Sequence, residues 1–508
     1  MMTTTDHPIC ANARVLILGI GETGAAAARW CARQGLALRV ADTREQPPGI
    51  DGLRGQLPAD TEYRLGADAF HADALEGVGQ LVLSPGLAPN ATPTRELLAE
   101  AQARQIEVVG EIELFARALE SLAREGYAPK VLAITGTNGK TTVTALTRLM
   151  VESAGLRACA AGNISPAALT ALMDAQDAGA LPDVWVIELS SFQLETTSSL
   201  RHAAAVVLNI SQDHLDWHGD AAAYANAKAR IYRQADILLV NRDDAEVLAM
   251  VPGLAGLNVR SFGRDAPELV GDVGLVDGDA MAWLAAAEPT ELDEPAAPVR
   301  RKKNAPEPTR SAGRLSRLMP VDALRLRGMH NATNVLAALA LARALDLGWG
   351  PLLRAARDYS GEPHRAAFVR SVAGIDFIDD SKGTNVGATV AALEGMGQRV
   401  VLIAGGLGKG QDFSPLAQAV TRYARAVVLI GQDASLIERA LSQSGVEVVQ
   451  ASDMDAAVGR ANALAQPGDT VLLSPACASM DMFKNYGHRG QAFVAAVQSL
   501  ALDQGEVA

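Results

Sequence analysis

The chain has 508 residues, too many for a single hydrophobic core, and a length of this kind predicts about three domains. Hydrophobic residues make up 49% of the chain and charged residues 20%, which is typical of a soluble globular protein. The net charge of −13, from 45 basic and 58 acidic residues, argues against nucleic acid or an anionic membrane surface as the main partner.

The cysteines and the apolar runs indicate the cellular compartment of the protein. The four cysteines are far apart and form no CxxC pair, which favours a reducing compartment over a disulfide framework or a zinc cluster. The N-terminus lacks the basic and apolar regions of a secretory signal, and the apolar runs are too short to span a membrane. We therefore expect a cytoplasmic protein, and a monomer.

Short runs of β-branched and apolar residues alternate with Ala/Leu-rich helical stretches along the whole chain. This alternation predicts an α/β fold with largely parallel sheets. We expect a Rossmann-like domain over residues 1–118, a central P-loop domain over 119–360 and a Rossmann-like α/β domain over 361–508. The strands expected with most weight are Val15–Leu18, Leu81–Leu83, Val131–Ile134, Val184–Ile187, Ala205–Leu208, Ile237–Val240, Val400–Ile403, Val427–Ile430 and Val471–Leu473.

The first chemical motif is the GxGxxG turn Gly19–Gly24, which lies between a strand and the expected helix Ala25–Arg33. Asp42-Thr43-Arg44 follows the next strand, where an acidic residue meets a ribose in nucleotide-binding folds. The turn predicts a nucleotide or dinucleotide site and does not decide which. Glu22 is expected to point away from any diphosphate. The turn Ser84-Pro85-Gly86 closes another strand and is a candidate for the same pocket.

The second motif, Thr135–Thr142 with the sequence TGTNGKTT, lies between an apolar strand and a helix. Backbone amides and the helix N-terminus bind phosphate in such a turn, Lys140 adds a positive charge, and a following hydroxyl holds Mg²⁺. A strict P-loop has glycine at the position of Ile134, so this is a variant of the motif. The alternative, a glycine-rich turn before a core helix, is disfavoured by Lys-Thr-Thr.

Acidic and histidine side chains follow the P-loop. Glu188 ends a strand and, with the Thr141 hydroxyl, suits Mg²⁺, which prefers one or two carboxylates beside phosphate oxygens. His214 and His218 are four residues apart, but without an HExxH motif or a third ligand zinc is disfavoured. We assign His214 to the metal or phosphate region, and His218 to the surface or to packing.

Residues 286–318 interrupt the pattern with five prolines and the basic cluster Arg300–Lys303. This composition predicts a disordered insertion loop within the central domain. A polybasic tether for nucleic acid or membrane is the alternative, which the acidic whole disfavours.

The last third of the chain places lysines and hydroxyl groups at strand ends. Lys382 lies in such a loop, and Lys409 lies in the glycine-rich turn Ala404–Gly410. Cys477 has no histidine partner specified, and the serines of Ser474–Ser479 lack a GxSxG elbow, so nucleophilic catalysis is disfavoured. The set suits an anionic small substrate.

Taken together, these motifs resemble the Mur ligase family from Arg14 to Arg489. The resemblance implies an ATP-dependent ligase of cytoplasmic peptidoglycan precursor synthesis, which joins D-glutamate to UDP-N-acetylmuramoyl-L-alanine through an acyl phosphate. It rests on five segments in the right order, namely Thr135–Thr142, Glu188–Glu195, Gly328–Asn334, Asp380–Asn385 and Ser474–Ser479.

The resemblance also implies roles for single residues. The implied cofactors are ATP and Mg²⁺, with two metal ions expected and one held through a carbamylated Lys228. For catalysis it implies Lys140, Lys228, His214 and Lys382, and for the metal Thr141, Glu188, His214 and Lys228. For ATP it implies Gly136, Thr137, Asn138, Gly139, Lys140, Thr141, Thr142, Asn331, Asn334, Arg365 and Asp380. For the UDP-substrate it implies Thr23, Asp42, Thr43, Arg44, Gly86 and Asn163, and for the amino acid Lys382, Thr384, Lys409, Ser479, Met480 and Tyr486.

Departures from the family pattern leave the choice of amino acid open. Met480 and Tyr486 replace an expected Leu and Phe, Gly383 replaces a common Ala, and Glu362 replaces an apolar residue. L-glutamate, or another Mur or folylpolyglutamate substrate, is the alternative within the family. Other classes are a nicotinamide-dependent oxidoreductase using Gly19–Gly24 and a nucleotide-regulated binding module. We expect the last domain to swing onto the central one at a hinge near 358–362.

Overall fold

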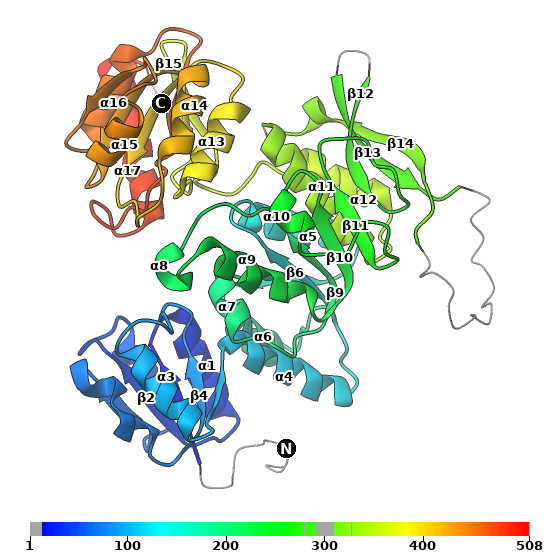
Figure 1. Cartoon of the computed structure of the whole chain (residues 1–508), viewed down its shortest axis with the longest axis vertical. Helices are drawn as coiled ribbons and strands as arrows, with labels where there is room; N and C mark the ends of the chain where they lie inside the picture. Colours follow the sequence, from blue (N-terminus) through cyan, green and yellow to red (C-terminus); the bar gives the residue numbers. More distant parts are fainter. Residues whose placement is uncertain (1–12, 279–280, 291–308, 327, 507–508) are drawn as a thin grey trace.

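The computed structural model describes residues 13–278, 281–290, 309–326 and 328–506. Three sheets form the centres of three bodies that follow one another along the chain. In Figure 1 the N-terminal body, in blue, and the C-terminal body, in orange and red, both lie beside the green central body.

The N-terminal domain is a five-stranded parallel sheet in the order β3-β2-β1-β4-β5. The strand order reverses beside β1, which opens a crevice at the carboxyl ends of β1 and β4, where α/β folds bind their ligands. Its strands are β1 (Arg14–Leu18), β2 (Leu38–Asp42), β3 (Glu62–Leu65), β4 (Val78–Leu83) and β5 (Glu107–Val109), and its helices are α1 (Glu22–Arg33), α2 (Ile50–Arg54) and α3 (Thr94–Ala103).

The central domain is a nine-stranded sheet in the order β14-β13-β12-β11-β10-β9-β6-β8-β7. It is parallel from β7 to β12 and antiparallel at β13 and β14. The strands are β6 (Lys130–Thr135), β7 (Ala158–Gly162), β8 (Val184–Glu188), β9 (His202–Val207), β10 (Ala235–Asn241), β11 (Val259–Phe262), β12 (Val273–Gly278), β13 (Met281–Glu288) and β14 (Arg314–Pro320). The helices are α4 (Glu111–Arg124), α5 (Lys140–Ser153), α6 (Ala168–Asp177), α7 (Ser191–Glu195), α8 (Leu215–His218), α9 (Ala221–Ala229), α10 (Ala245–Leu248), α11 (Met329–Arg343) and α12 (Trp349–Asp358).

The C-terminal domain is a six-stranded sheet in the order β15-β16-β20-β17-β18-β19, in which only the β15–β16 pair is antiparallel among the described strands. The strands are β15 (Ala367–Val372), β16 (Ile375–Asp379), β17 (Val400–Gly405), β18 (Ala424–Ile430), β19 (Glu447–Gln450) and β20 (Thr470–Leu473). The helices are α13 (Val386–Gly395), α14 (Ser414–Tyr423), α15 (Ala434–Ala440), α16 (Met454–Leu464) and α17 (Tyr486–Asp503).

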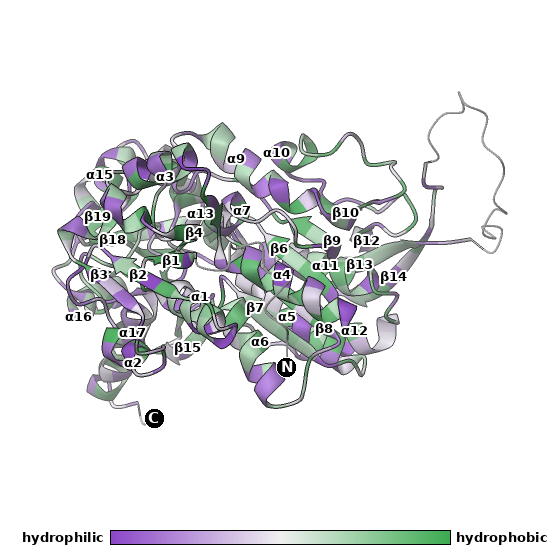
Figure 2. Ribbon diagram, turned by 90° about the horizontal axis from the view of Figure 1, so that it is seen from below, coloured by the Kyte–Doolittle hydropathy of each residue, from purple (hydrophilic) through white to green (hydrophobic). Residues whose placement is uncertain are grey.

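Burial follows the sequence pattern that predicted the strands. The central strand segments 131–134 and 400–404 are buried on both faces, as expected for parallel strands covered by helices. Figure 2 shows apolar residues on the strands and on the helix faces that cover them. Within the described part of the chain, no helix is both long and apolar enough to cross a bilayer.

The α/β fold with three domains is as the sequence predicts, but two boundaries differ. Strands β13 and β14 extend into both ends of the expected loop at 286–318, whose segment 291–308 lies outside the described residues. The first residues of that expected loop, Ala286 and Ala287, are buried in β13, which lies between β12 and β14. The predicted boundary at 118 falls within α4, which packs on both α1 and α6.

Candidate active site

The variant P-loop joins the end of β6 to the start of α5. Gly139 precedes α5 with a φ of +86°, and Gly136 has a φ of +152°. A Cβ on Gly136 would lie 2.9 Å from the Leu208 side chain, and one on Gly139 would overlap the Asn334 amide. Glycine is therefore required at both positions by backbone conformation and by space.

Two lysines share the P-loop carbonyl of Gly136. Lys140 Nζ donates to this oxygen at 2.8 Å and to the Thr137 carbonyl at 2.8 Å, and Lys228 Nζ donates to the Gly136 oxygen at 2.9 Å. Burial lowers the pKa of Lys228 well below its usual value, and the charge on Lys140 lowers it further. Burial also lowers the pKa of Lys140. The turn thus holds two crowded cations, which an anionic ligand would relieve.

Glu188 ends β8 beside this pair and is 2% exposed. Its Oε1 accepts a hydrogen bond from Asn163 Nδ2 at 2.8 Å, whereas its Oε2 is buried without a hydrogen-bond partner among the described residues. An orphaned carboxylate oxygen next to a phosphate-binding turn fits a cation ligand. Across the described residues, no three His, Cys, Asp or Glu side chains cluster as a complete metal site.

The two histidines lie on the loop around α8 and flank one aromatic ring. His214 has a φ of +54° and contacts Phe192 edge-on, with ring centroids 4.8 Å apart. His218 stacks on Phe192 at 5.6 Å, and its Nε2 lies 2.9 Å from Ser191 Oγ. The packing role predicted for His218 is confirmed. His214 also lies 3.7 Å from Asp213, whose charge acts on Lys140 and Lys228.

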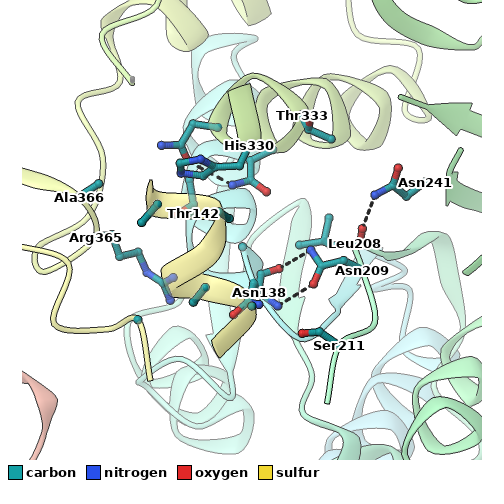
Figure 3. Close-up of a pocket in the computed structure, with 18 of the residues that line it drawn as sticks. Asn138, Thr142, Leu208, Asn209, Ser211, Asn241, His330, Thr333, Arg365 and Ala366 are labelled. Carbon is teal, nitrogen blue, oxygen red and sulfur yellow. Dashed lines mark hydrogen bonds between the residues drawn. The ribbon is translucent and has the colours of Figure 1, made fainter. Parts of the chain in front are cut away.

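A cavity of about 330 Å³ lies between the central and C-terminal domains (Figure 3). Asn138 connects its walls, because its amide N–H donates to Asn209 Oδ1 at 2.8 Å and its side chain exchanges hydrogen bonds with Asn385. Sequence-predicted residues from both domains line it, namely Asn138, Gly139, Thr142, Asn331, Asn334, Arg365, Asp380 and Lys382.

The C-terminal wall of this cavity carries an acid and two cations. Burial raises the pKa of Asp380 to about 7, although Ser474 Oγ donates to it at 2.7 Å and Arg365 stabilises its charge. Burial lowers the pKa of Lys382 to about 8, and Arg365 lowers it further. The wall is positive enough to attract phosphate or carboxylate groups.

Of the residues predicted for the amino acid, Tyr486 and Thr384 contact Lys382. Its Nζ lies 3.8 Å from the centre of the Tyr486 ring, a cation–π contact, and the Thr384 amide donates to its carbonyl. Ser479 is 3% exposed, whereas Met480 is 75% exposed. Lys409, with a φ of +52°, is exposed on the glycine-rich turn, which pairs with the loop after β20 through Leu407 and Ala478.

The turns predicted for the UDP-substrate meet at the carboxyl ends of β1, β2 and β4. Ser84 Oγ donates to the Gly19 carbonyl at 2.8 Å and so joins the turn that contains Gly86 to the GxGxxG turn. Asp42 accepts from the Ile20 amide at 2.8 Å and pairs with Arg44 at 2.7 Å. Thr23 is the second residue of the adjoining helix α1, and Thr43 follows β2. Glu22 turns toward the central domain, where Ser165 Oγ donates to it at 2.7 Å.

The structure adds cavity residues that the sequence prediction did not assign to the site. Asn209 and Arg264 follow β9 and β11, and Asn241 is the last residue of β10, at the same sheet edge as the P-loop. Their position at the carboxyl ends of parallel strands was the available signal. His330 also lines the cavity; burial lowers its pKa to about 4, and Arg264 contributes. Thr141 is the second residue of α5 and is not among the residues that line this cavity.

Three domain-family models match the chain in order. A Mur ligase MurD-like N-terminal domain matches residues 13–110, a Mur ligase middle domain 134–282, and a Mur ligase glutamate ligase domain 364–477. These matches fall on the three sheets described above.

Curated proteins and solved structures agree with these matches. The UDP-N-acetylmuramoylalanine–D-glutamate ligases of Bordetella bronchiseptica and Burkholderia pseudomallei are 66% and 54% identical, the first over 100% of both chains and the second over 97% of this chain and 98% of its own. In fold, MurF ligase from Thermotoga maritima in complex with ADP gives a TM-score of 0.56 at 14% identity, covering 97% of this chain and 99% of its own. UDP-N-acetylmuramate-alanine ligase from the same organism gives 0.52 at 18% identity, covering 96% and 100%. The chain belongs to the Mur ligase family.

Proposed function

We propose that this chain is the ATP-dependent ligase that joins D-glutamate to UDP-N-acetylmuramoyl-L-alanine in peptidoglycan precursor synthesis, with ADP and phosphate as products. Identity of 66% over the full length to a ligase with that name supports the substrates. One structural observation carries the reaction class, namely that P-loop residues and Lys382 line a single cavity between two domains. A phosphate-binding turn thus faces a second, cationic wall on which another anion can bind.

The residues of the central domain are arranged to hold ATP. Backbone amides of the P-loop and the N-terminus of α5 suit the phosphates, and Lys140 supplies the charge within the turn. Asn331 and Asn334 lie at the start of α11, where Asn334 Nδ2 donates to Asn331 Oδ1 at 3.2 Å. We assign the adenine side of the cavity to these asparagines and the phosphate side to Arg365 and Asp380.

The side chains beside the P-loop also fit a magnesium ion. Glu188 offers its orphaned Oε2, and we assign the Thr141 hydroxyl and His214 to the same region. When bound, Mg²⁺ would neutralise phosphate charge during transfer. The residues of this chain contribute orientation, because Asn163 fixes the other oxygen of Glu188.

We assign a carbamate to Lys228, as a carboxylate-like ligand for a second metal ion. Carbon dioxide reacts with a neutral amine, forming an N–C bond and releasing one proton. The lowered pKa of Lys228 favours that neutral amine. A carbamate would also exchange the repulsion between two ammonium groups for an attraction to Lys140. The signal of a ¹³C-carbamate on the protein in labelled bicarbonate, absent from a Lys228→Arg variant, tests this assignment.

The proposed reaction has two steps. The γ-phosphoryl group of ATP passes to the alanyl carboxylate, which gives an acyl phosphate and ADP. The glutamate amine then attacks the carbonyl carbon, phosphate leaves, and the amine loses a proton. Positioning and charge neutralisation by Lys140 and Lys382, together with the metal ligand assigned to Lys228, supply the catalysis. Because water would hydrolyse the acyl phosphate, closure of the domain cavity is expected during turnover.

The decisive experiment measures phosphate release from ATP and Mg²⁺ with UDP-N-acetylmuramoyl-L-alanine, with D-glutamate or L-glutamate in parallel. We expect turnover only with D-glutamate. Turnover only with L-glutamate would keep the mechanism and place the difference at Met480 and Tyr486. An absence of turnover with both amino acids would refute the assigned reaction, and binding of NAD instead of a UDP-substrate would favour an oxidoreductase.

A further inference from the structure

Glu22 occupies an unusual place for a carboxylate, inside the GxGxxG turn expected to meet a diphosphate. The structure directs its side chain across the domain boundary. Ser165 Oγ donates to its Oε2 at 2.7 Å, and the backbone N–H of Ala167 donates to its Oε1 at 3.2 Å. Ala167 is the N-cap residue of α6 and gives that helix no side-chain cap. Glu22 therefore supplies a negative cap to α6 from another domain.

The same face of α1 continues this contact along α6. Arg29 Nη2 donates to Thr170 Oγ1 at 3.0 Å, and Arg33 pairs with Asp177 at 2.7 Å. Residues 22, 29 and 33 are seven and four positions apart, so they lie on one side of the helix. Glu22 lies at the N-terminus of α6 and Arg33 lies near its C-terminus. Both charges are therefore favourable with respect to the dipole of α6.

The loop that Glu22 holds is also the loop that orients Glu188. Gly162 N donates to the Pro166 carbonyl at 3.1 Å, which closes the segment 162–166 into a compact turn. Within this turn, Asn163 donates from its backbone to the Glu188 carbonyl and from its side chain to Glu188 Oε1, both at 2.8 Å. Contacts thus run from the first nucleotide turn to the carboxylate beside the P-loop.

We propose that Glu22 is a positioning residue that fixes the UDP-binding turn relative to the Asn163–Glu188 pair, so that one substrate can span both domains. This inference rests on the proposed function. It predicts that Glu22 matters for a ligand that reaches from one domain to the other and not for UDP alone. The opposite role, a carboxylate merely tolerated beside a diphosphate, predicts tighter binding of both ligands when the charge is removed.

The experiment compares the full-length wild type with Glu22→Ala, Glu22→Gln and, as a control, Glu45→Ala. Glu45 is an exposed carboxylate on the loop after β2, so its removal changes the net charge of the same domain equally. Equilibrium binding of UDP is measured beside KM and kcat for UDP-N-acetylmuramoyl-L-alanine, and a thermal unfolding scan checks that each variant is folded.

We expect Glu22→Ala to raise KM for the whole substrate by about fivefold, the upper range for an exposed charged contact, with UDP affinity unchanged or higher. Glu22→Gln keeps an acceptor for Ala167 and should recover most of the loss, and Ser165→Ala should add little to Glu22→Ala. A KM that is unchanged or lower in Glu22→Ala, or a parallel loss of UDP affinity, would overturn the proposal.

The design separates this inference from the assigned reaction. If the wild type gives no turnover, the proposed function has failed. The role of Glu22 is then tested by equilibrium binding of UDP and of the whole UDP-substrate. In that case the proposal requires the wild type to bind the whole UDP-substrate more tightly than UDP. It also requires Glu22→Ala to bind the two ligands with equal affinity. Equal affinities of the wild type for the two ligands would overturn the proposal as well.

Discussion

The lysine side chains at this site are buried close to other cations, and both effects change their pKa values. Lys140 and Lys228 share one carbonyl oxygen, and Lys382 lies beside Arg365. Burial lowers the pKa of each of these lysines, and neighbouring cations lower it further. An anionic substrate would relieve the repulsion between these buried cations. Relief of that repulsion would contribute favourably to the binding free energy.

The charge on Lys382 gives the first prediction. Because burial lowers its pKa to about 8, the ammonium is present below that pH and is lost above it. If Lys382 binds the glutamate carboxylates, KM for glutamate should rise several-fold between pH 7 and 9. Arginine stays charged over this range, so Lys382→Arg should show a flatter profile even if its activity is lower. Steady-state kinetics against pH measure both, and an equally steep rise in the variant would contradict the assignment.

The sequence could identify the residue types at the site but not their partners. Lys140, Glu188 and Lys382 were predictable because Lys140 begins a helix, Glu188 ends a strand and Lys382 lies in a strand-to-helix loop, each within a recognisable motif. That Lys228 would share the Gly136 carbonyl with Lys140 depends on how the fold places α9 beside the P-loop, since Lys228 and Gly136 are 92 residues apart in sequence. Likewise, the expectation that Glu22 points away from the diphosphate agrees with the structure, but its contact with α6 required the domain arrangement.

Helix α5 has a glycine at each end, and the two glycines have different surroundings. Gly139 precedes the helix and Gly155 follows it, with φ values of +86° and +93°. A Cβ at Gly139 would overlap Asn334, whereas a Cβ at Gly155 would meet nothing within 4 Å. The two positions therefore separate backbone strain from loss of the nucleotide site.

We expect Gly155→Ala to cost about 1 kcal/mol of stability through its left-handed backbone and to leave KM for ATP unchanged. Gly139→Ala carries the same strain and also displaces Asn334, so its KM for ATP should rise at least about tenfold. Denaturant unfolding and ATP kinetics on both variants test the contrast. Equal ATP kinetics in the two variants would contradict the role given to this turn.

Glu111 begins α4 and is 3% exposed. Its Oε1 accepts from the Leu169 amide of α6 at 2.6 Å, and its Oε2 is buried without a hydrogen-bond partner in the described structure. Burial raises its pKa from 4.5 to about 7. Between pH 4.5 and 7, the folded state therefore keeps a proton on Glu111 that the unfolded state releases. The free-energy cost of ionising this buried carboxyl is absent below pH 4.5, grows between the two values and is complete above pH 7.

Glu111→Gln keeps an acceptor for Leu169 and removes the ionisation. Relative to the wild type, it should gain stability as the pH rises from 5 to 8, by at most about 3 kcal/mol for a shift of this size. Denaturant unfolding at the two pH values gives the difference. Glu120→Gln, at an exposed position of the same helix, is the control and should show little pH-dependent change. A constant difference between Glu111→Gln and the wild type would rule out an ionised Glu111 as the cause.

For the whole molecule, strand and helix alternation was enough to predict three α/β domains. It failed at the two ends of the loop expected at 286–318, where Ala286 and Ala287 are buried in β13 and residues 314–318 belong to β14. The placement of the domains could not follow from local pattern, because it depends on a few long-range polar contacts. One of them pairs Asn138 of the P-loop with Asn385 of the C-terminal domain, 247 residues away.

This amide pair offers a test of domain closure. The segment between α12 and β15 contains the expected hinge, where Tyr359 donates to Glu362 at 2.9 Å. Beyond it, Asn385 Nδ2 donates to Asn138 Oδ1 at 3.0 Å, while Asn385 Oδ1 caps α13 by accepting from Ala388 at 2.9 Å. Serine is also a good helix cap but is too short to reach Asn138, so Asn385→Ser removes the contact between domains and keeps the cap.

We expect Asn385→Ser to favour open arrangements, with a larger radius of gyration without ligands and a KM for ATP raised about threefold to tenfold, as for the loss of one or two hydrogen bonds. Substrates should restore compactness in both proteins if the C-terminal domain closes on the central one. Asp453→Ser changes the cap of α16, away from the cavity, and should leave both quantities unchanged. Solution scattering with and without ligands decides the matter, since identical inter-domain distances in all states would exclude closure at this hinge.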